Sequence, residues 1–156
     1  MNAMKHISLA IVLVIEGPLI CMAEPNIPIE QQVILKQVPE RFRYKEFWEP
    51  TEKETQTALA TIMAFVHDPK QNDRELKKIQ SHYGQYYVQF IGILVEGKRR
   101  LYCNFFLVDE SLLSERLKEN WQEKLIRVRD GGFYYWRIEY DLETGKCLNF
   151  ESNGYA

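Results

Sequence analysis

Residues 130–141 read DGGFYYWRIEYD, and this stretch decides the fold. Its large apolar side chains alternate with other residues, so an extended chain would separate the two sets onto opposite faces. One face carries Tyr134, Trp136, Ile138 and Tyr140, and the other carries Tyr135, Arg137 and Glu139. Aromatic and β-branched residues at this period favour a strand that is buried on one side. We therefore expect a strand over residues 134–140.

The turns on either side of this strand predict a hairpin. Asp130-Gly131-Gly132 has the residues that a tight turn needs, because glycine reaches positive φ without a Cβ clash. Gly145 stands where a left-handed residue would close the short loop 141–146. Alternation resumes at Cys147, so we expect Leu148 and Phe150 to join the aromatic face. This hairpin ends the predicted sheet.

A helix is predicted over residues 51–67. Thr51 and Glu54 have the spacing of a capping box, in which each side chain accepts from the backbone N–H of the other residue. An apolar stripe follows at helical spacing, and Asp68-Pro69 ends the helix. The stripe consists of Ala58, Leu59, Ile62, Met63 and Val66. We expect this helix to pack on the sheet.

A first hairpin is predicted over residues 86–108, with Glu96-Gly97 as its turn. Pairing across the turn sets Val95 against Lys98 and Phe90 against Cys103. Both strands are apolar at nearly every position around residues 90–95 and 102–108, which indicates cover on both faces or a face used for association. One or two helical turns are expected from Asp73 to Gln80.

Residues 109–121 are predicted to form a second helix, and residues 125–128 a short strand. The element order predicts an α+β fold, in which one main helix packs on a curved four-stranded antiparallel sheet. This is a cystatin-like or related α/β-roll architecture, formed by a single domain over residues 51–156.

The first 23 residues have the pattern of a secretory signal. Lys5 gives a positive start, an apolar run follows from Ile7 to Ile15, and small residues precede Glu24. The run is far shorter than the roughly 20 residues that span a bilayer. We therefore expect an exported protein of the bacterial periplasm or medium, with no membrane span in the mature chain.

Residues 24–50 are expected to form an N-terminal arm interrupted by prolines. Residues 29–38 suit a short strand or a helical turn. Further along, Arg41, Arg43 and Lys45 alternate with Phe42 and Tyr44. Such an interleave can stack on bases or sugars. We favour an arm whose aromatic side chains pack on the sheet while its basic side chains stay in water.

Composition limits the function classes. The 156 residues suit one domain, and 46% hydrophobic with 27% charged residues is ordinary for a soluble protein. A net charge of −2 argues against a nucleic-acid partner, since phosphate contacts need a basic surplus. The sequence has no His/Cys spacing for zinc and no phosphate-binding glycine loop, so we expect neither a metal nor a cofactor.

Cys103 and Cys147 remain after the signal, and an oxidising compartment makes a disulfide between them plausible. In a simple meander they lie on next-but-one strands about 9.6 Å apart, whereas a disulfide needs Cα atoms within roughly 7 Å. Either the strand order brings the two strands together or both thiols stay free.

The C-terminal third resembles a group of small exported bacterial proteins of unknown function. The residues that carry the resemblance are Asp130-Gly131-Gly132, then Tyr140-Asp141-Leu142-Glu143-Thr144-Gly145, and the ending Asn153-Gly154-Tyr155-Ala156, together with residues 102–106. The resemblance covers about the last 70 residues. It implies export and this fold, and it transfers no activity and no functional residue.

No catalytic residues are assigned from the sequence. The first hypothesis is a non-enzymatic binding protein, in one version an inhibitor or immunity-type protein that plugs another protein's active site. Tyrosine and arginine are favoured in binding hot spots. The candidate binding residues are Trp48, Arg127, Asp130, Tyr135, Arg137 and Glu139.

Two alternatives stay open. One is an envelope assembly protein that self-associates, for example as a homodimer, through residues 90–108. The other is a hydrolase with a site around His82, Asp130 and nearby carboxylates.

Overall fold

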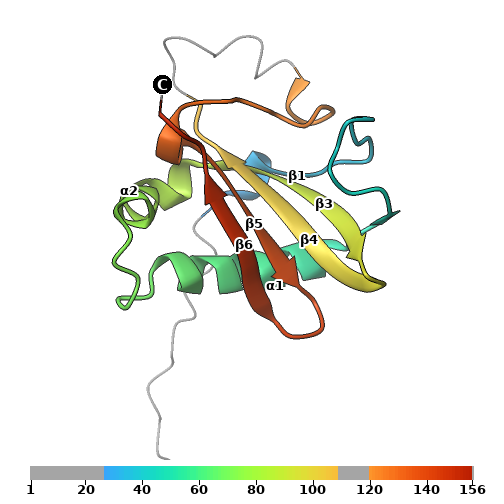
Figure 1. The fold of residues 1–156 in the computed structure, drawn as a ribbon, viewed down its shortest axis with the longest axis horizontal. Coiled ribbons are helices and arrows are strands. Elements are labelled where there is room, and N and C mark those ends of the chain that lie inside the picture. Colours follow the sequence, from blue (N-terminus) through green and yellow to red (C-terminus); the bar gives the residue numbers. More distant parts are fainter. Residues whose placement is uncertain (1–26, 109–119, 156) are drawn as a thin grey trace, which may run out of the picture.

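The computed structural model describes residues 27–108 and 120–155. The predicted signal and the predicted helix over 109–121 therefore lie largely outside the described residues. Within these residues the chain has the α-helices α1 and α2 and one sheet, and Figure 1 shows how they are arranged. The elements are η1 (Ile29–Gln31), β1 (Gln32–Ile34), β2 (Phe47–Trp48), α1 (Glu52–Val66), α2 (Arg74–His82), η2 (Tyr83–Gln85), β3 (Tyr87–Val95), β4 (Lys98–Phe106), η3 (Gly132–Tyr134), β5 (Tyr135–Asp141) and β6 (Lys146–Ser152).

The α+β class is confirmed, but the four-stranded antiparallel sheet is wrong. The sheet has six strands in the order β1-β3-β4-β5-β6, with β2 also paired to β3. The arm supplies the additional strands: β1 runs parallel to β3 and β2 runs antiparallel to it. The sheet is therefore larger than predicted and mixed, and it is not clearly that of a cystatin-like roll.

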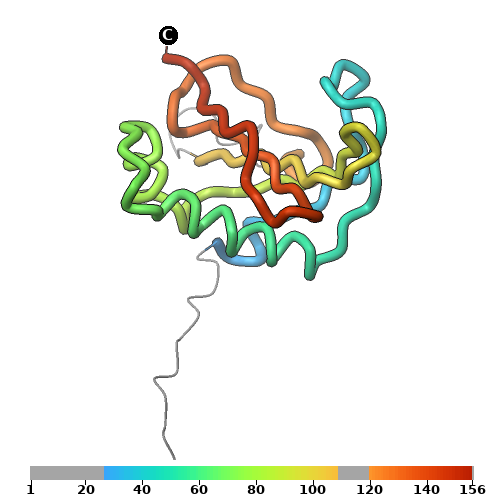
Figure 2. The backbone as a smooth tube through the Cα atoms, turned by 60° about the horizontal axis from the view of Figure 1, so that its bottom comes forward, coloured from blue at the N-terminus to red at the C-terminus, as the bar shows by residue number. Residues whose placement is uncertain are grey.

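The predicted main helix is confirmed as α1. Thr51 caps it, and Thr51 and Glu54 form the expected capping box. The apolar stripe is buried at Ala58, Leu59, Ile62 and Val66, whereas Met63 is only half-buried. Figure 2 shows α1 on one side of the strands and the segment 120–134 on the other.

The first hairpin has the predicted register. Val95 pairs with Lys98, and Phe90 pairs with Cys103. Glu96 and Gly97 have φ values of 54° and 75°, the left-handed geometry of a two-residue turn that follows the twist of the strands.

Both faces of this hairpin are covered within the chain. One face packs on α1 through Phe90, Cys103 and Phe105. The other packs against Phe42 of the arm and Leu125. The expectation of cover on both faces is confirmed. We call this second face, covered by residues 35–46 and 121–128, the arm face.

The predicted strand over 125–128 is wrong, since these residues form an irregular segment on the arm face. Buried Gln89 fixes that segment, because its amide nitrogen donates to the carbonyls of Trp121 and Lys124 and its oxygen accepts from the N–H of Ile126. Side-chain hydrogen bonds thus replace the ladder that a strand would have used.

The last hairpin contains a bulge that the alternation did not predict. Leu148 lies opposite Glu139 and Glu151 lies opposite Arg137, so two residues of β6 face one residue of β5. Asn149 sits in this bulge with φ of 50°. As a result Phe150 packs on the helix-side core as predicted, but Leu148 does not, which corrects its expected place.

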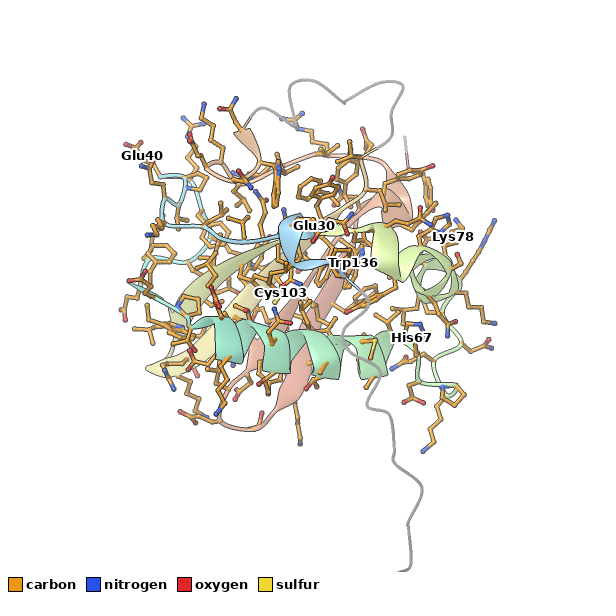
Figure 3. All side chains as sticks on the ribbon, turned by 180° about the vertical axis from the view of Figure 1, so that it is seen from behind. Glu30, Glu40, His67, Lys78, Cys103 and Trp136 are labelled. Atoms are coloured by element: carbon orange, nitrogen blue, oxygen red, sulfur yellow. The ribbon has the colours of Figure 1, made fainter. Side chains whose placement is uncertain are left out.

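Cys103 and Cys147 are free thiols. Strand β5 separates β4 from β6, so the spacing argument decides against a disulfide. Figure 3 shows Cys103 and Trp136 in the interior between α1 and the sheet. Within residues 27–108 and 120–155, no helix is long and apolar enough to span a bilayer.

Candidate functional site

A buried carboxylate organises the arm face. The Glu139 side chain has no exposed surface. Its Oε1 accepts from Arg43 at 2.8 Å and from the Tyr44 hydroxyl, and its Oε2 accepts from Arg100 at 3.2 Å and from the Asn149 amide at 3.0 Å. A buried charge needs such partners, because burial removes the hydration that stabilises it in water. Glu139 therefore fastens the arm, β4 and β6 to β5.

The bulge in β6 extends this cluster. By turning the strand over at Asn149, it places Glu151 on the same face as Arg137 and Glu139. Glu151 accepts from Arg43 at 3.1 Å and also pairs with Arg137. Without the extra residue, Glu151 would point toward α1. The local backbone geometry of β6 thus decides which charges meet on the arm face.

Three ionisable groups of the cluster have pKa values that differ from their ordinary values. Burial would raise the pKa of the Glu151 carboxyl, but the hydrogen bond from Arg43 and the charges of Arg137 and Arg43 hold it below its ordinary value. Burial together with the hydrogen bond to Glu139 raises the pKa of Tyr44 to about 12. The pKa of Arg43 is also raised, since Glu151, Tyr44 and Glu139 outweigh the effect of burial. At neutral pH Arg43 and Glu151 are therefore charged and Tyr44 is protonated.

A small cavity opens beside this cluster, with a volume of about 170 Å³. Four arginines and three apolar or aromatic side chains line it: Arg41, Arg43, Arg127, Arg137, Phe42, Tyr102 and Leu125. Arg41 and Arg127 are exposed, and neither has an ion-pair or hydrogen-bond partner among the described residues. We call this the arginine cavity. Among the described residues, these two guanidinium groups leave the cavity with a local surplus of positive charge.

The structure brings together three of the six predicted binding residues. Arg127 and Arg137 line the arginine cavity, and Glu139 lies buried beside it as the partner of Arg43. Tyr135 is buried at the other end of the sheet, near Phe106 and Trp121. The face chosen from the sequence is therefore largely covered, and only Arg137 remains partly accessible on it.

Asp130 and Trp48 lie elsewhere. Asp130 is in the loop before η3, where it forms a bridge to Gly154. Trp48 donates its indole N–H to the backbone carbonyls of Ile93 and Arg100, and Arg99 lies over its ring at 4.8 Å. Trp48 also lines a separate cleft of about 430 Å³ between β1 and β2.

Sequence reasoning missed several members of the site. They are Arg41, Arg43, Tyr44, Arg100, Asn149 and Glu151. The basic and aromatic alternation over residues 41–45 was the available signal. Phe42 packs on Tyr102 as expected, but Arg43 does not simply stay in water, since it is ion-paired to two glutamates.

His82, the histidine proposed for hydrolase chemistry, is engaged within its own helix. The His82 Nδ1 lies 2.9 Å from the carbonyl of Lys78 in its own helix, and the ring packs on Phe133. Burial raises the pKa of the Cys103 thiol well above its ordinary value, which makes the thiol inert. Within residues 27–108 and 120–155, no group of three or more His, Cys, Asp or Glu side chains could hold a metal.

The motif residues of the C-terminal third contact one another. Gly132 donates its N–H to the carbonyl of Gly154 at 3.1 Å. Its φ of 53° is left-handed, and a Cβ at this position would collide with the ring of Tyr155, so the contact requires glycine. Asn153 donates to the carbonyls of Val128 and Asp130. These contacts close the end of the sheet, which gives the motif a structural role. The resemblance to exported proteins stays a prediction.

Comparison with protein-family models, with curated proteins and with solved structures found no match. The function is therefore inferred from the residues and geometry of this chain.

Proposed function

We propose that this chain is a small exported, non-enzymatic binding protein that recognises a protein partner through its arm face. One observation carries the proposal. Arg41 and Arg127 are exposed and unpaired within the described chain, and they stand beside Phe42 and Tyr102 at a depression in the surface. Arginine and aromatic side chains supply much of the binding energy in protein interfaces. An inhibitor or immunity-type protein is the version that best suits such a charged face.

Export is supported by the signal pattern of residues 1–23. Self-association through the first hairpin has less support, because α1 and the arm cover the two faces of β3 and β4. A hydrolase has less support, because Nδ1 of His82 contacts the Ser81 hydroxyl and the Lys78 carbonyl, and no carboxylate of the described residues pairs with this side chain.

Affinity capture from a native envelope fraction tests the proposal. The bait is the mature protein with a C-terminal tag, and mass spectrometry identifies what is retained. We expect one protein in stoichiometric amount, and we expect its loss from a bait that carries Arg41→Glu and Arg127→Glu. The matched control bait carries Lys98→Glu and Lys146→Glu, which reverse two exposed charges at the starts of β4 and β6 that do not line the arginine cavity.

The comparison between the baits decides the outcome. Retention of the same partner by the arginine variant would remove the arm face from the binding surface. A bait that retains only further copies of itself would favour the assembly alternative. Retention of no protein at all would contradict a protein partner.

A further inference from the structure

The arginine cavity already holds a carboxylate at its edge. Glu151 pairs with Arg43 and Arg137, and its side chain remains 38% exposed. The opposite side of the cavity has Arg41 and Arg127, which meet no carboxylate in the described chain. The cavity therefore has one side that is neutralised by the chain itself and one side that is not.

We propose that the arginine cavity binds the carboxylate of an acidic side chain from a peptide segment, with Arg41 and Arg127 as the primary ligands. This inference rests on the proposed function and names the chemistry that its surface recognises. Guanidinium groups present planar donors that match a carboxylate, and charge-assisted hydrogen bonds of this kind are the stronger ones. Two guanidinium groups that have no ion-pair or hydrogen-bond partner within residues 27–108 and 120–155 leave donors for an incoming anion.

The cavity suits a side-chain carboxylate in size and lining. About 170 Å³ holds a carboxyl group and the methylene groups that carry it, and Phe42, Tyr102 and Leu125 form an apolar lining for those methylenes. Glu151 shows the same chemistry within the chain, because its carboxylate binds two of the four cavity arginines. A carboxylate is therefore the anion that the cavity arginines already bind within the chain itself.

Two of the arginines are oriented before any ligand arrives. Arg43 donates an N–H to Oε1 of buried Glu139 at 2.8 Å, and Arg137 donates an N–H to Oδ1 of Asn153 at 3.2 Å. Such second contacts restrict the guanidinium groups, so less side-chain freedom is lost on binding. Glu151 then competes with the ligand. Its charge repels an incoming carboxylate, and its side chain already pairs with Arg43 and Arg137.

This competition makes a sharp test. The probe is a hexaglutamate peptide with blocked ends, titrated into the ¹⁵N-labelled chain at about 50 mM salt, where screening is weak. The readout is the shift of the arginine side-chain Nε–Hε signals. We expect saturable shifts at Arg41 and Arg127, about threefold to tenfold weaker binding in Arg127→Gln, and about threefold tighter binding in Glu151→Gln.

Two control variants match these changes. Arg129→Gln removes an exposed arginine two residues away that does not line the cavity, and Glu143→Gln removes an exposed carboxylate in the β5–β6 turn. Neither control should change the affinity by more than about twofold, because exposed charges at a distance are screened. Thermal unfolding of each variant confirms that it is folded before its affinity is compared.

Several outcomes would overturn the inference. They are the absence of saturable shifts, equal losses in Arg127→Gln and Arg129→Gln, and weaker or unchanged binding in Glu151→Gln. Inorganic phosphate and an oligothymidylate are titrated in parallel. Tighter binding of either to the same arginines would assign the cavity to phosphate groups instead.

Failure here is distinct from failure of the proposed function. A protein captured through the arm face, with no response to the acidic peptide, would leave the binding role standing and remove the carboxylate. If the acidic peptide binds while no protein is captured, the carboxylate site stands and the proposed protein-binding role falls.

Discussion

Replacing Glu139 by Gln tests whether the buried carboxylate holds the arm on the sheet. The side chain has no exposed surface, and it accepts from two arginines, a tyrosine and an asparagine. The amide keeps the size of the side chain, but it removes the charge and turns one acceptor into a donor. Arg43 and Arg100 then keep their charges and lose their shared partner.

The magnitude follows from the exposure of those partners. Breaking a buried ion pair from one side costs about 3–5 kcal/mol, because an uncompensated charge stays behind. Arg43 is 41% exposed and keeps Glu151, so it recovers part of this loss in water. Arg100 is only 18% exposed, and its remaining carboxylate, Asp141, lies 3.8 Å away. We therefore expect a loss at the lower end, about 3 kcal/mol.

Urea unfolding at pH 7, followed by tryptophan fluorescence, measures this loss as a change in the free energy of unfolding. Glu143→Gln is the matched control, and we expect it to stay within about 0.5 kcal/mol of the parent chain, as surface changes do. A loss below about 1 kcal/mol in Glu139→Gln would refute the reasoning. It would mean that the four contacts add little beyond what water supplies.

Three further predictions concern the sheet and its thiols. Gly92→Ala should lower the free energy of unfolding by about 1–3 kcal/mol in thermal melts, since a Cβ would collide with the backbone carbonyl oxygen of Trp48 and lie 2.9 Å from Cε2 of its ring. Gly154→Ala, whose Cβ would meet no atom within 4 Å, should be neutral in the same measurement. The pKa of Glu151 is lower in the folded chain than its ordinary value, so the ionised side chain stabilises the fold. This stabilisation is fully present above the ordinary pKa and is lost as the pH falls through the pKa of the folded state. When the free energy of unfolding is measured against pH, its decrease below about pH 4.5 should therefore be less steep in Glu151→Gln than in the parent chain. Burial raises the pKa of the Cys147 thiol to about 11, so its alkylation, measured on tryptic peptides, should be slow at pH 8 and rise steeply toward that pH.

Local patterns predicted the elements whose signals lie within a few neighbouring residues. The capping box at Thr51 and Glu54 fixed the start of α1, and the Glu96-Gly97 pair fixed the register of the first hairpin. The alternation over 134–140 placed Trp136 in the core. The predicted strand starts one residue before β5, since Tyr134 belongs to a short 3₁₀ helix.

Long-range pairing was the part that the sequence could not show. Strands β1 and β2 have three and two residues, too short for a periodic signal, and both exist because they pair with the edge of β3. The segment over 125–128 has strand-like residues, yet buried Gln89 takes its hydrogen bonds. The same holds for the site, because the partners of Glu139 come from residues 43, 44, 100 and 149.

The bulge at Asn149 is where the fold and the site are decided together. A regular β6 would direct Glu151 toward α1, into the apolar core, where an unpaired carboxylate is costly. The extra residue instead turns Glu151 toward Arg137 and lets Asn149 reach Glu139. Most non-glycine residues resist positive φ, but asparagine tolerates it better than most, so Asn149 suits the position. One residue in a conformation that few side chains adopt thus sets the charge balance of the arginine cavity, and with it the anion that the cavity can accept.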